Sequence, residues 1–200
     1  MRPQDDLAQR RFWIFDMDGT LTVAAHDFAA IKRTLGLAVD RPILEQMAEL
    51  PPARQGELFA ALDAIEHDIA LKSEVQPGAT ELLQALRQRG AALGIVTRNS
   101  HPVALATLRQ CGLAEFFAPR FILGREACAP KPSGAGIRLL LDAWQAAPWD
   151  AVMVGDYLYD LQAGREVGTL TVHLDASDPC EYAGWADTCV RDLHALRSLL

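Results

Sequence analysis

The stretch FWIFDMDGTLT, residues 12–22, joins four consecutive apolar or aromatic residues to two carboxylates. An unbroken run such as Phe12–Phe15 is typical of a strand buried on both faces, because a half-buried strand would alternate with polar residues. Asp16 and Asp18 lie two apart, so in an extended chain their side chains share one face. Gly19 then allows the backbone to turn away sharply. The sequence therefore predicts a buried strand that carries two acidic side chains at its carboxyl end.

Two carboxylates at the end of a buried strand favour a cation between them. Their charges repel and burial removes their hydration, so the pair is costly without a partner. Oxygen ligands of this kind favour a hard divalent ion, and Mg²⁺ is usual where a phosphate completes the coordination. The plainer alternative is that Asp16 and Asp18 merely end a strand and begin a turn, since Asp and Gly are common turn residues. Other segments of the chain must decide between these interpretations.

The composition fits one sizeable core and argues against several classes of function. The chain has 200 residues and 50% of them are hydrophobic, which leaves room for a small inserted module. A formal net charge of −7 argues against nucleic acid or an anionic membrane as the main partner, because both require a basic face. No run approaches the ~20 apolar residues that span a bilayer, and residues 1–11 lack the apolar segment of a signal peptide. We expect a cytoplasmic protein.

The cysteines follow no pattern that predicts a function. Cys111, Cys128, Cys180 and Cys189 form no C-x-x-C pair and have no neighbouring His at zinc spacing. In a cytoplasmic chain, scattered cysteines of this kind are expected to be reduced thiols. We assign no chemical role to any of them.

Hydrophobic periodicity divides the chain into a core and an insertion. Over residues 23–76 the strand signals stop, and apolar residues recur three and four apart, as in helices. Beyond this segment, short apolar strands alternate with helices of ~10 to 14 residues, which is typical of a parallel sheet covered on both faces. We predict an α/β fold whose core consists of residues 1–22 and 77–200. Residues 23–76 are predicted to form a separate all-helical unit.

Polar residues stand at the ends of three separate predicted strands. Asp16, Thr97 and Asp156 each follow an apolar run directly. In an open parallel sheet, ligands bind outside the carboxyl ends of the strands, where the strand order reverses. We therefore expect these three residues to belong to one site, although they are far apart in the sequence.

Four segments in order resemble the motifs of the haloacid dehalogenase-like hydrolases. The segment around Asp16 resembles the first motif, and segments near Thr97, Lys131 and Asp156 resemble the other three. The resemblance covers most of the chain and implies a Rossmann-like core, with the helical insertion, residues 23–76, as a small cap over the site. Within this superfamily the chain looks similar to the phosphoglycolate phosphatases.

The resemblance implies a role for each acid. Asp16 would be the nucleophile that forms an aspartyl-phosphate and so divides the reaction into two easier steps. Asp18 would protonate the leaving oxygen and later take a proton from water, a role that a neighbouring carboxylate favours by raising its pKa. Asp16, Asp156 and the backbone carbonyl of Asp18 would hold Mg²⁺. Asp160 would orient Lys131 or a metal-bound water; alternatively, it is only a charge favoured near a helix N-terminus.

The segment Thr97-Arg98-Asn99 and Lys131 are the candidate phosphate contacts. Free backbone N–H groups between a strand and a helix, together with the Thr97 hydroxyl, can hold phosphoryl oxygens. The alternative is that Ser100 caps this helix and Thr97 only ends the strand. Lys131 is held between two prolines in a stiff extended segment, unlike an ordinary solvated lysine. The resemblance implies that it bridges the nucleophile and the phosphoryl group.

The prediction that results is a Mg²⁺-dependent phosphatase for a small phosphorylated metabolite. A sugar-phosphate mutase of the same superfamily is an alternative, and a catalytically inactive phosphate-binding module is another. The physiological substrate and the choice between monomer and homodimer are left open by the sequence. So are any roles of His26 and Arg125, which are candidates for contact with substrate.

Overall fold

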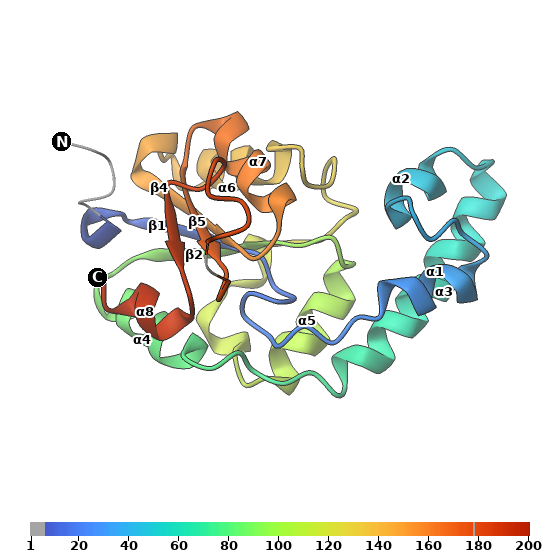
Figure 1. Cartoon of the computed structure of the whole chain (residues 1–200), viewed down its shortest axis with the longest axis horizontal. Coiled ribbons are helices and arrows are strands. Elements are labelled where there is room, and N and C mark those ends of the chain that lie inside the picture. The colour runs from blue at the N-terminus through green and yellow to red at the C-terminus, as the bar shows by residue number, and fades with distance from the viewer. Residues whose placement is uncertain (1–6, 178) are drawn as a thin grey trace.

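A six-stranded parallel sheet forms the centre of the computed structural model, which describes residues 7–177 and 179–200 (Figure 1). The strand order is β3-β2-β1-β4-β5-β6, and every pairing is parallel. The strands are β1 (Phe12–Phe15), β2 (Ala92–Val96), β3 (Ile122–Leu123), β4 (Ala151–Gly155), β5 (Leu170–Leu174) and β6 (Thr188–Val190). Because β2 and β4 flank β1, the strand order reverses at β1. The predicted α/β fold class is confirmed.

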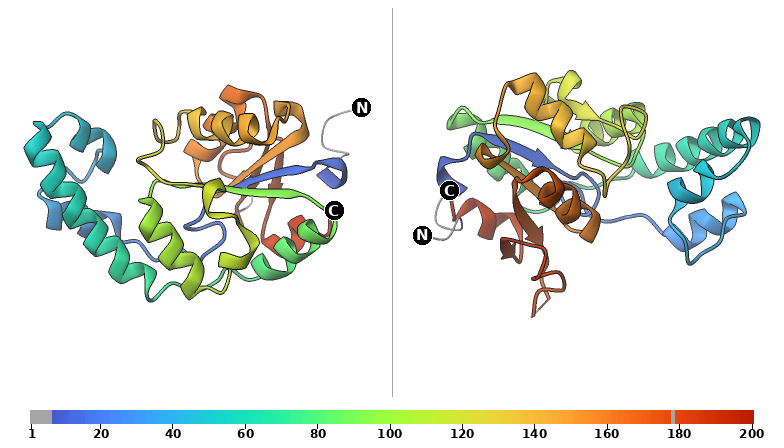
Figure 2. Two further views of the ribbon diagram at one scale, coloured as in Figure 1. Left: turned by 180° about the vertical axis from the view of Figure 1, so that it is seen from behind. Right: turned by 90° about the horizontal axis from the view of Figure 1, so that it is seen from above.

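Helices cover both faces of the sheet (Figures 1 and 2). One layer contains α4 (Ala79–Gln88), α5 (His101–Gln110) and α8 (Leu193–Arg197), and the other contains α6 (Ala135–Trp144) and α7 (Leu158–Val167). The first strand shows why both layers are needed. Trp13 and Phe15 lie in the apolar cluster of the first layer and Ile14 in that of the second, and all three are fully buried. Burying each such side chain contributes about 1.5–3 kcal/mol.

Three helices stand apart from the sheet, at the right of Figure 1: α1 (Phe28–Leu35), α2 (Ile43–Ala48) and α3 (Pro52–Ala70). Their apolar residues form a hydrophobic cluster of their own. The chain enters and leaves this group through two connections that lie side by side. The backbone N–H of Val23 donates to the Glu74 carbonyl at 2.9 Å, and that of Gln76 donates to the Leu21 carbonyl at 2.9 Å. These helices fall within the predicted insertion, and its status as a separate domain stays a prediction.

Short 3-10 turns lie between several of these elements. They span Ala114–Phe116, Pro119–Phe121 and Pro148–Asp150, and the last two lead directly into β3 and β4. The longest described helix is α3, with 19 residues. Among the described residues, no helix combines the length and the apolar character needed to cross a membrane.

The expectation of reduced thiols is wrong for two of the four cysteines. Cys180 and Cys189 form a disulfide, whereas Cys111 and Cys128 are free. The parallel pairing of β5 with β6 places Cys189 beside His173, and the loop between the strands returns Cys180 to the same place. Nothing in the spacing of the cysteines indicated this contact, because strand pairing and not sequence proximity brings the two sulfur atoms together.

Candidate active site

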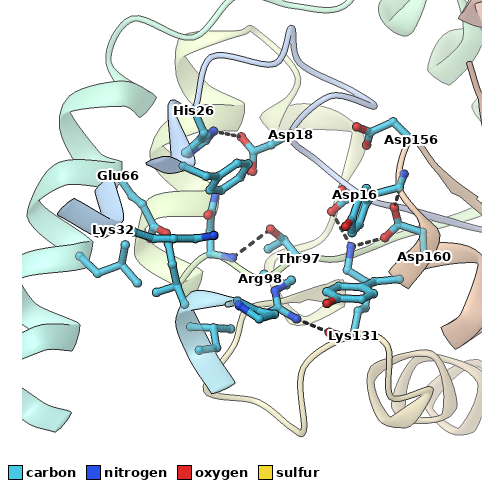
Figure 3. Close-up of a pocket in the computed structure, with 18 of the residues that line it drawn as sticks. Asp16, Asp18, His26, Lys32, Glu66, Thr97, Arg98, Lys131, Asp156 and Asp160 are labelled. Carbon is cyan, nitrogen blue, oxygen red and sulfur yellow. Dashed lines mark hydrogen bonds and ion pairs between the residues drawn. The ribbon is translucent and has the colours of Figure 1, made fainter. Parts of the chain in front are cut away.

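The carboxyl ends of the central strands meet at one cavity of about 580 Å³ (Figure 3). Asp16 follows β1, Thr97 follows β2 and Asp156 follows β4, and all three line this cavity. Lys131 reaches the same cavity from the loop that precedes α6. The cavity is also lined by residues of the helical insertion, so it lies between the sheet and the three separate helices. The expected meeting of the three strand ends is therefore present in the structure.

Lys131 is held between two aspartates. Its Nζ lies 2.6 Å from Oδ1 of Asp16 and 2.6 Å from Oδ1 of Asp160 (Figure 3). Burial alone would lower the pKa of Lys131, but the two carboxylates outweigh it and hold the pKa above its usual value. The lysine is therefore positively charged at neutral pH, and Asp160 fixes its position beside Asp16.

Three carboxylates gather around this lysine. Oxygen atoms of Asp16, Asp156 and Asp160 all lie within 4.8 Å of one another. Burial, reinforced by the charge of Asp16, raises the pKa of Asp156 to about 6. Lys131 supplies one positive charge against these three acids, so the cluster retains negative charge when all of them are ionised. A set of oxygen donors with excess negative charge fits a hard divalent cation such as Mg²⁺.

The loop after β1 lies directly against Asp156. Gly19 has a φ of +86°, and a Cβ atom there would stand 2.2 Å from Oδ2 of Asp156. Only glycine therefore allows the backbone to pass at this distance. The Thr20 hydroxyl donates a hydrogen bond of 2.9 Å to Oδ1 of the same carboxylate. The turn residues of the first motif thus position the acid that follows β4.

Asp18 occupies a separate position on the cavity wall. Its Oδ2 accepts a 2.8 Å hydrogen bond from the Asn99 side chain, and its Oδ1 lies 3.8 Å from Nδ1 of His26. Burial, with the nearby charges of Asp16 and Glu66, raises the pKa of Asp18 to about 7. A carboxyl group with this pKa can both donate and accept a proton near neutral pH.

The segment after β2 lines the cavity with all three predicted residues. The Thr97 hydroxyl accepts a 3.1 Å hydrogen bond from the backbone N–H of Asn99, whose side chain holds Asp18. The Arg98 guanidinium instead forms an ion pair of 2.7 Å with Glu45 of α2. Arg98 therefore connects the core to the insertion, and contact between this segment and a phosphate stays a prediction.

Glu66 is a site residue that the sequence interpretation missed. It lines the cavity on the buried face of α3, in register with Leu58, Leu62 and Ala70. Burial raises the pKa of Glu66 to about 7, although Arg125 opposes this shift. The sequence did contain one signal: Glu66 is an acidic residue at a position of the helical repeat where the other residues are small or apolar.

The structure gives definite places to the two residues left unassigned. His26 lines the cavity beside Asp18, and its Nε2 is buried without a hydrogen-bond partner among the described residues. Arg125 contacts Glu66 at 2.9 Å and also pairs with Asp63, so it connects the loop after β3 to α3. The sequence around a single His or Arg does not indicate its role, because its partners are brought to it only by the fold.

Comparison with known proteins agrees with this fold and site. The model of the family described as haloacid dehalogenase-like hydrolase matches residues 13–168, so the chain belongs to this family of hydrolases. A haloacid dehalogenase-like hydrolase domain-containing protein of Arabidopsis thaliana is 32% identical over 174 residues, which cover 81% of this chain and 69% of the relative. An N-acetylmuramic acid 6-phosphate phosphatase of Pseudomonas putida is 30% identical over 178 residues, or 79% of each chain.

A solved structure described as a predicted phosphoglycolate phosphatase, from Haemophilus somnus, has the same fold. It superposes with a TM-score of 0.73 at 20% identity, over 96% of this chain and 99% of the other. The family expected from the four motifs is therefore confirmed.

Proposed function

We propose that this chain is a Mg²⁺-dependent phosphatase that hydrolyses a small phosphorylated metabolite through an aspartyl-phosphate on Asp16. The observation that carries the proposal is the position of Lys131, between Asp16 and Asp160 at 2.6 Å from each. This ammonium group neutralises the carboxylate that must approach an anionic phosphoryl group.

The donor set supports Mg²⁺ as the cation. Asp16, Asp156 and the backbone carbonyl of Asp18 would hold it, and the crowded carboxylates supply the negative charge that favours it. When bound, the ion neutralises charge on the phosphoryl oxygens and so assists their approach to a carboxylate. Asp160 keeps Lys131 in place beside this group.

In the first step a carboxylate oxygen of Asp16 attacks phosphorus. A new O–P bond forms, the P–O bond to the leaving group breaks, and the leaving oxygen takes a proton from Asp18. The raised pKa of Asp18, about 7, supplies the protonated form that this transfer needs.

In the second step water attacks phosphorus and the bond between phosphorus and Asp16 breaks. Asp18, now ionised, takes a proton from the water, which restores both aspartates and releases inorganic phosphate. The hydrogen bond from Asn99 to Asp18, 2.8 Å long, orients the carboxylate during both transfers.

The cavity supports a small substrate with a second anionic group. Its volume is about 580 Å³, and Lys32 and Arg41 line its wall on the side of the insertion. A phosphoglycolate-like ester, which carries a carboxylate beyond its phosphate, fits this charge pattern. The relative from Pseudomonas putida is named for N-acetylmuramic acid 6-phosphate, which also combines a phosphate with a carboxylate.

The test is phosphate release from a panel of phosphate monoesters that includes phosphoglycolate and N-acetylmuramic acid 6-phosphate. We expect release that depends on Mg²⁺ and disappears in Asp16→Asn, because an amide cannot act as the nucleophile. The matched control is Asp68→Asn, which makes the same change at an exposed position of α3 and should leave the rate unchanged.

Other outcomes would contradict the proposal. Undiminished release by Asp16→Asn would remove Asp16 from the nucleophile role. Conversion of a sugar phosphate to its isomer, with little free phosphate, would identify a mutase. Binding of phosphate esters without turnover of any of them would identify an inactive binding module.

A further inference from the structure

A group of soft metal ligands lies outside the cavity, at the edge of the sheet formed by β5 and β6. His173, Cys180 and Cys189 each offer a ligand atom, and these atoms all lie within 4.8 Å of one another. Strand pairing sets His173 beside Cys189, and Nδ1 of His173 lies 3.1 Å from Sγ of Cys180. The phosphatase mechanism uses none of these three side chains.

A hydrogen bond at Nε2 of His173 leaves Nδ1, the ring nitrogen beside Cys180, free to bind a cation. Nε2 lies 3.0 Å from the backbone carbonyl oxygen of Asp156, and because a carbonyl oxygen only accepts, Nε2 carries the hydrogen. In the neutral imidazole, Nδ1 then presents its lone pair towards Cys180. Histidines that bind metals usually donate their other N–H to a carbonyl or carboxylate in this way, which fixes the tautomer and the ring orientation.

The surroundings hold the imidazole in place but leave the sulfur atoms within reach. His173 is 1% exposed and packs against Tyr182, with the ring centroids 5.1 Å apart. Cys180 is half-buried and Cys189 is exposed. A reductant or a metal ion can therefore approach from the side of Cys189.

We propose that, once the Cys180–Cys189 disulfide is reduced, these cysteines and His173 bind a zinc-class cation. Reduction adds two electrons and two protons to the disulfide and gives two thiols, and metal binding then releases both thiol protons. Two thiolates and one imidazole are ligands typical of Zn²⁺, and a water molecule can complete a tetrahedral set. Ligands about 2.0–2.3 Å from one ion lie ~3.5–4 Å apart, so reduction requires only that the sulfur atoms separate modestly.

The metal site and the disulfide cannot form at the same time, because both use Cys180 and Cys189. The redox state of these two cysteines therefore decides whether the metal site can form. In the disulfide state His173 is bonded to the carbonyl of Asp156, the residue that follows β4 at the cavity. This inference stands independently of the proposed phosphatase activity, because none of its three ligands takes part in that mechanism.

The experiment is anaerobic titration of the reduced full-length chain with Co²⁺, followed by competition with Zn²⁺. A phosphine such as tris(2-carboxyethyl)phosphine reduces the disulfide and is itself oxidised to the phosphine oxide, so no competing thiol is added. We expect one equivalent of Co²⁺ to produce thiolate-to-cobalt charge-transfer absorption, which Zn²⁺ abolishes. The carboxylates of the cavity cannot produce this absorption, because they offer only oxygen.

Matched variants assign the absorption to these residues. Cys180→Ser and Cys189→Ser should each weaken Zn²⁺ binding by more than about 100-fold, since loss of an outer-shell partner alone costs 10–100-fold. The control Cys111→Ser/Cys128→Ser, which removes the two free cysteines, should bind as the wild type does. Wild-type protein oxidised with diamide should show no absorption, and this comparison involves no change of sequence that could disturb folding.

Three results would overturn the proposal: no charge-transfer absorption in the reduced protein, its persistence in Cys180→Ser and Cys189→Ser, or its loss in the control variant alone.

Discussion

The two aspartates of the first motif lie in different environments although they are two residues apart. Asp16 lies 2.6 Å from the ammonium group of Lys131. Asp18 accepts a hydrogen bond from Asn99 and lies 3.8 Å from a His26 nitrogen, and its pKa is raised to about 7 by burial and by neighbouring acids. This difference suits the roles that we propose, with Asp16 as the nucleophile and Asp18 as the group that transfers the proton.

We expect the rate of phosphate release to have a maximum near pH 7. Protonation of the leaving oxygen needs neutral Asp18, which is lost as the pH rises through about 7, while water activation needs the ionised form, which is lost as the pH falls through the same value. Asp18→Asn should lower the rate by about 10²–10⁴-fold and flatten the profile. Steady-state rates from pH 5 to 9 provide the measurement.

The control for this prediction is Asp142→Asn, at an exposed position of α6, which should keep the wild-type profile. If Asp18→Asn lost activity but kept the wild-type dependence on pH, the titration would belong to another group.

Local sequence patterns were sufficient to find the residues at the strand ends. Asp16, Thr97 and Asp156 follow apolar runs, and a parallel sheet necessarily brings such ends to one edge. The partners of a side chain are different, because they depend on how separate segments dock. The ion pair between Arg125 and Glu66 has no signal in the sequence around either residue, and the spacing of Cys180 and Cys189 does not indicate their disulfide.

At the scale of elements, α3 is attached to the core by a nearly buried ion pair. The side chains of Arg125 and Glu66 are 6% and 8% exposed, and their charged atoms lie 2.9 Å apart. Arg125 also pairs with Asp63, one turn earlier on the helix. Water cannot replace either partner easily, so removing one charge leaves the other buried and unpaired.

Arg125→Met should therefore destabilise the protein by about 3–5 kcal/mol, the usual cost of breaking a buried pair by removing one partner. The matched control is Arg54→Met, since Arg54 pairs with Glu57 at 2.8 Å on the exposed face of the same helix. That change should cost at most about 1 kcal/mol. Urea unfolding of the metal-free proteins measures both free energies.

A double variant separates the pair from the packing of the arginine. Arg125→Met combined with Glu66→Met removes both charges and should recover a large part of the lost stability. Equal losses for Arg125→Met and Arg54→Met would contradict the role of the buried pair.

The elements themselves follow from signals that are local in the sequence. Helix α1 begins after Asp27, whose side chain accepts a hydrogen bond of 2.9 Å from the Ala30 N–H, and ends at Gly36 in a left-handed conformation with φ 69°. Such signals identify the helices before their packing is known. The loop that carries Cys180 has no periodic pattern, and its course is set by the strands that it connects.

Among the described residues, four buried carboxyl groups hold protons more tightly in the folded than in the unfolded chain. The pKa values of Asp18, Glu66 and Asp160 are raised to about 7 and that of Asp156 to about 6, in each case chiefly by burial. A group whose pKa is raised on folding contributes stability below its unfolded pKa and loses it as the pH rises through the folded value.

The melting temperature of the metal-free protein should therefore fall as the pH rises from about 4 to 8. For a chain of this size, each 1 kcal/mol of lost stability corresponds to about 2–4 °C. If the proposed magnesium site forms, Mg²⁺ should reverse the trend, because it would bind the ionised carboxylates of the folded state and stabilise that state by mass action. Calorimetric scans with EDTA or with Mg²⁺ provide the measurement.

The pKa of Asp175 is lowered rather than raised on folding, so this residue contributes less stability as the pH falls. Its effect lies in a more acidic range of pH than that of the other carboxyl groups. Hydrogen bonds from Ser177 and from the Glu181 backbone lower its pKa to about 2, so its contribution is lost only in more acidic solution. A metal-free melting temperature that rose steadily from pH 4 to 8 would contradict the raised pKa values.

The paired connections at Val23 and Gln76 make the helical insertion a replaceable part. Because the chain leaves the core and returns to it at hydrogen-bonded neighbours, the two cut ends of the core would lie one turn apart if residues 23–75 were removed. A short turn could close that gap without moving any strand. We therefore expect the same core to accept covers of different size and chemistry, so that the range of substrates could change during evolution while the strand ends that hold Asp16, Thr97 and Asp156 stay as they are.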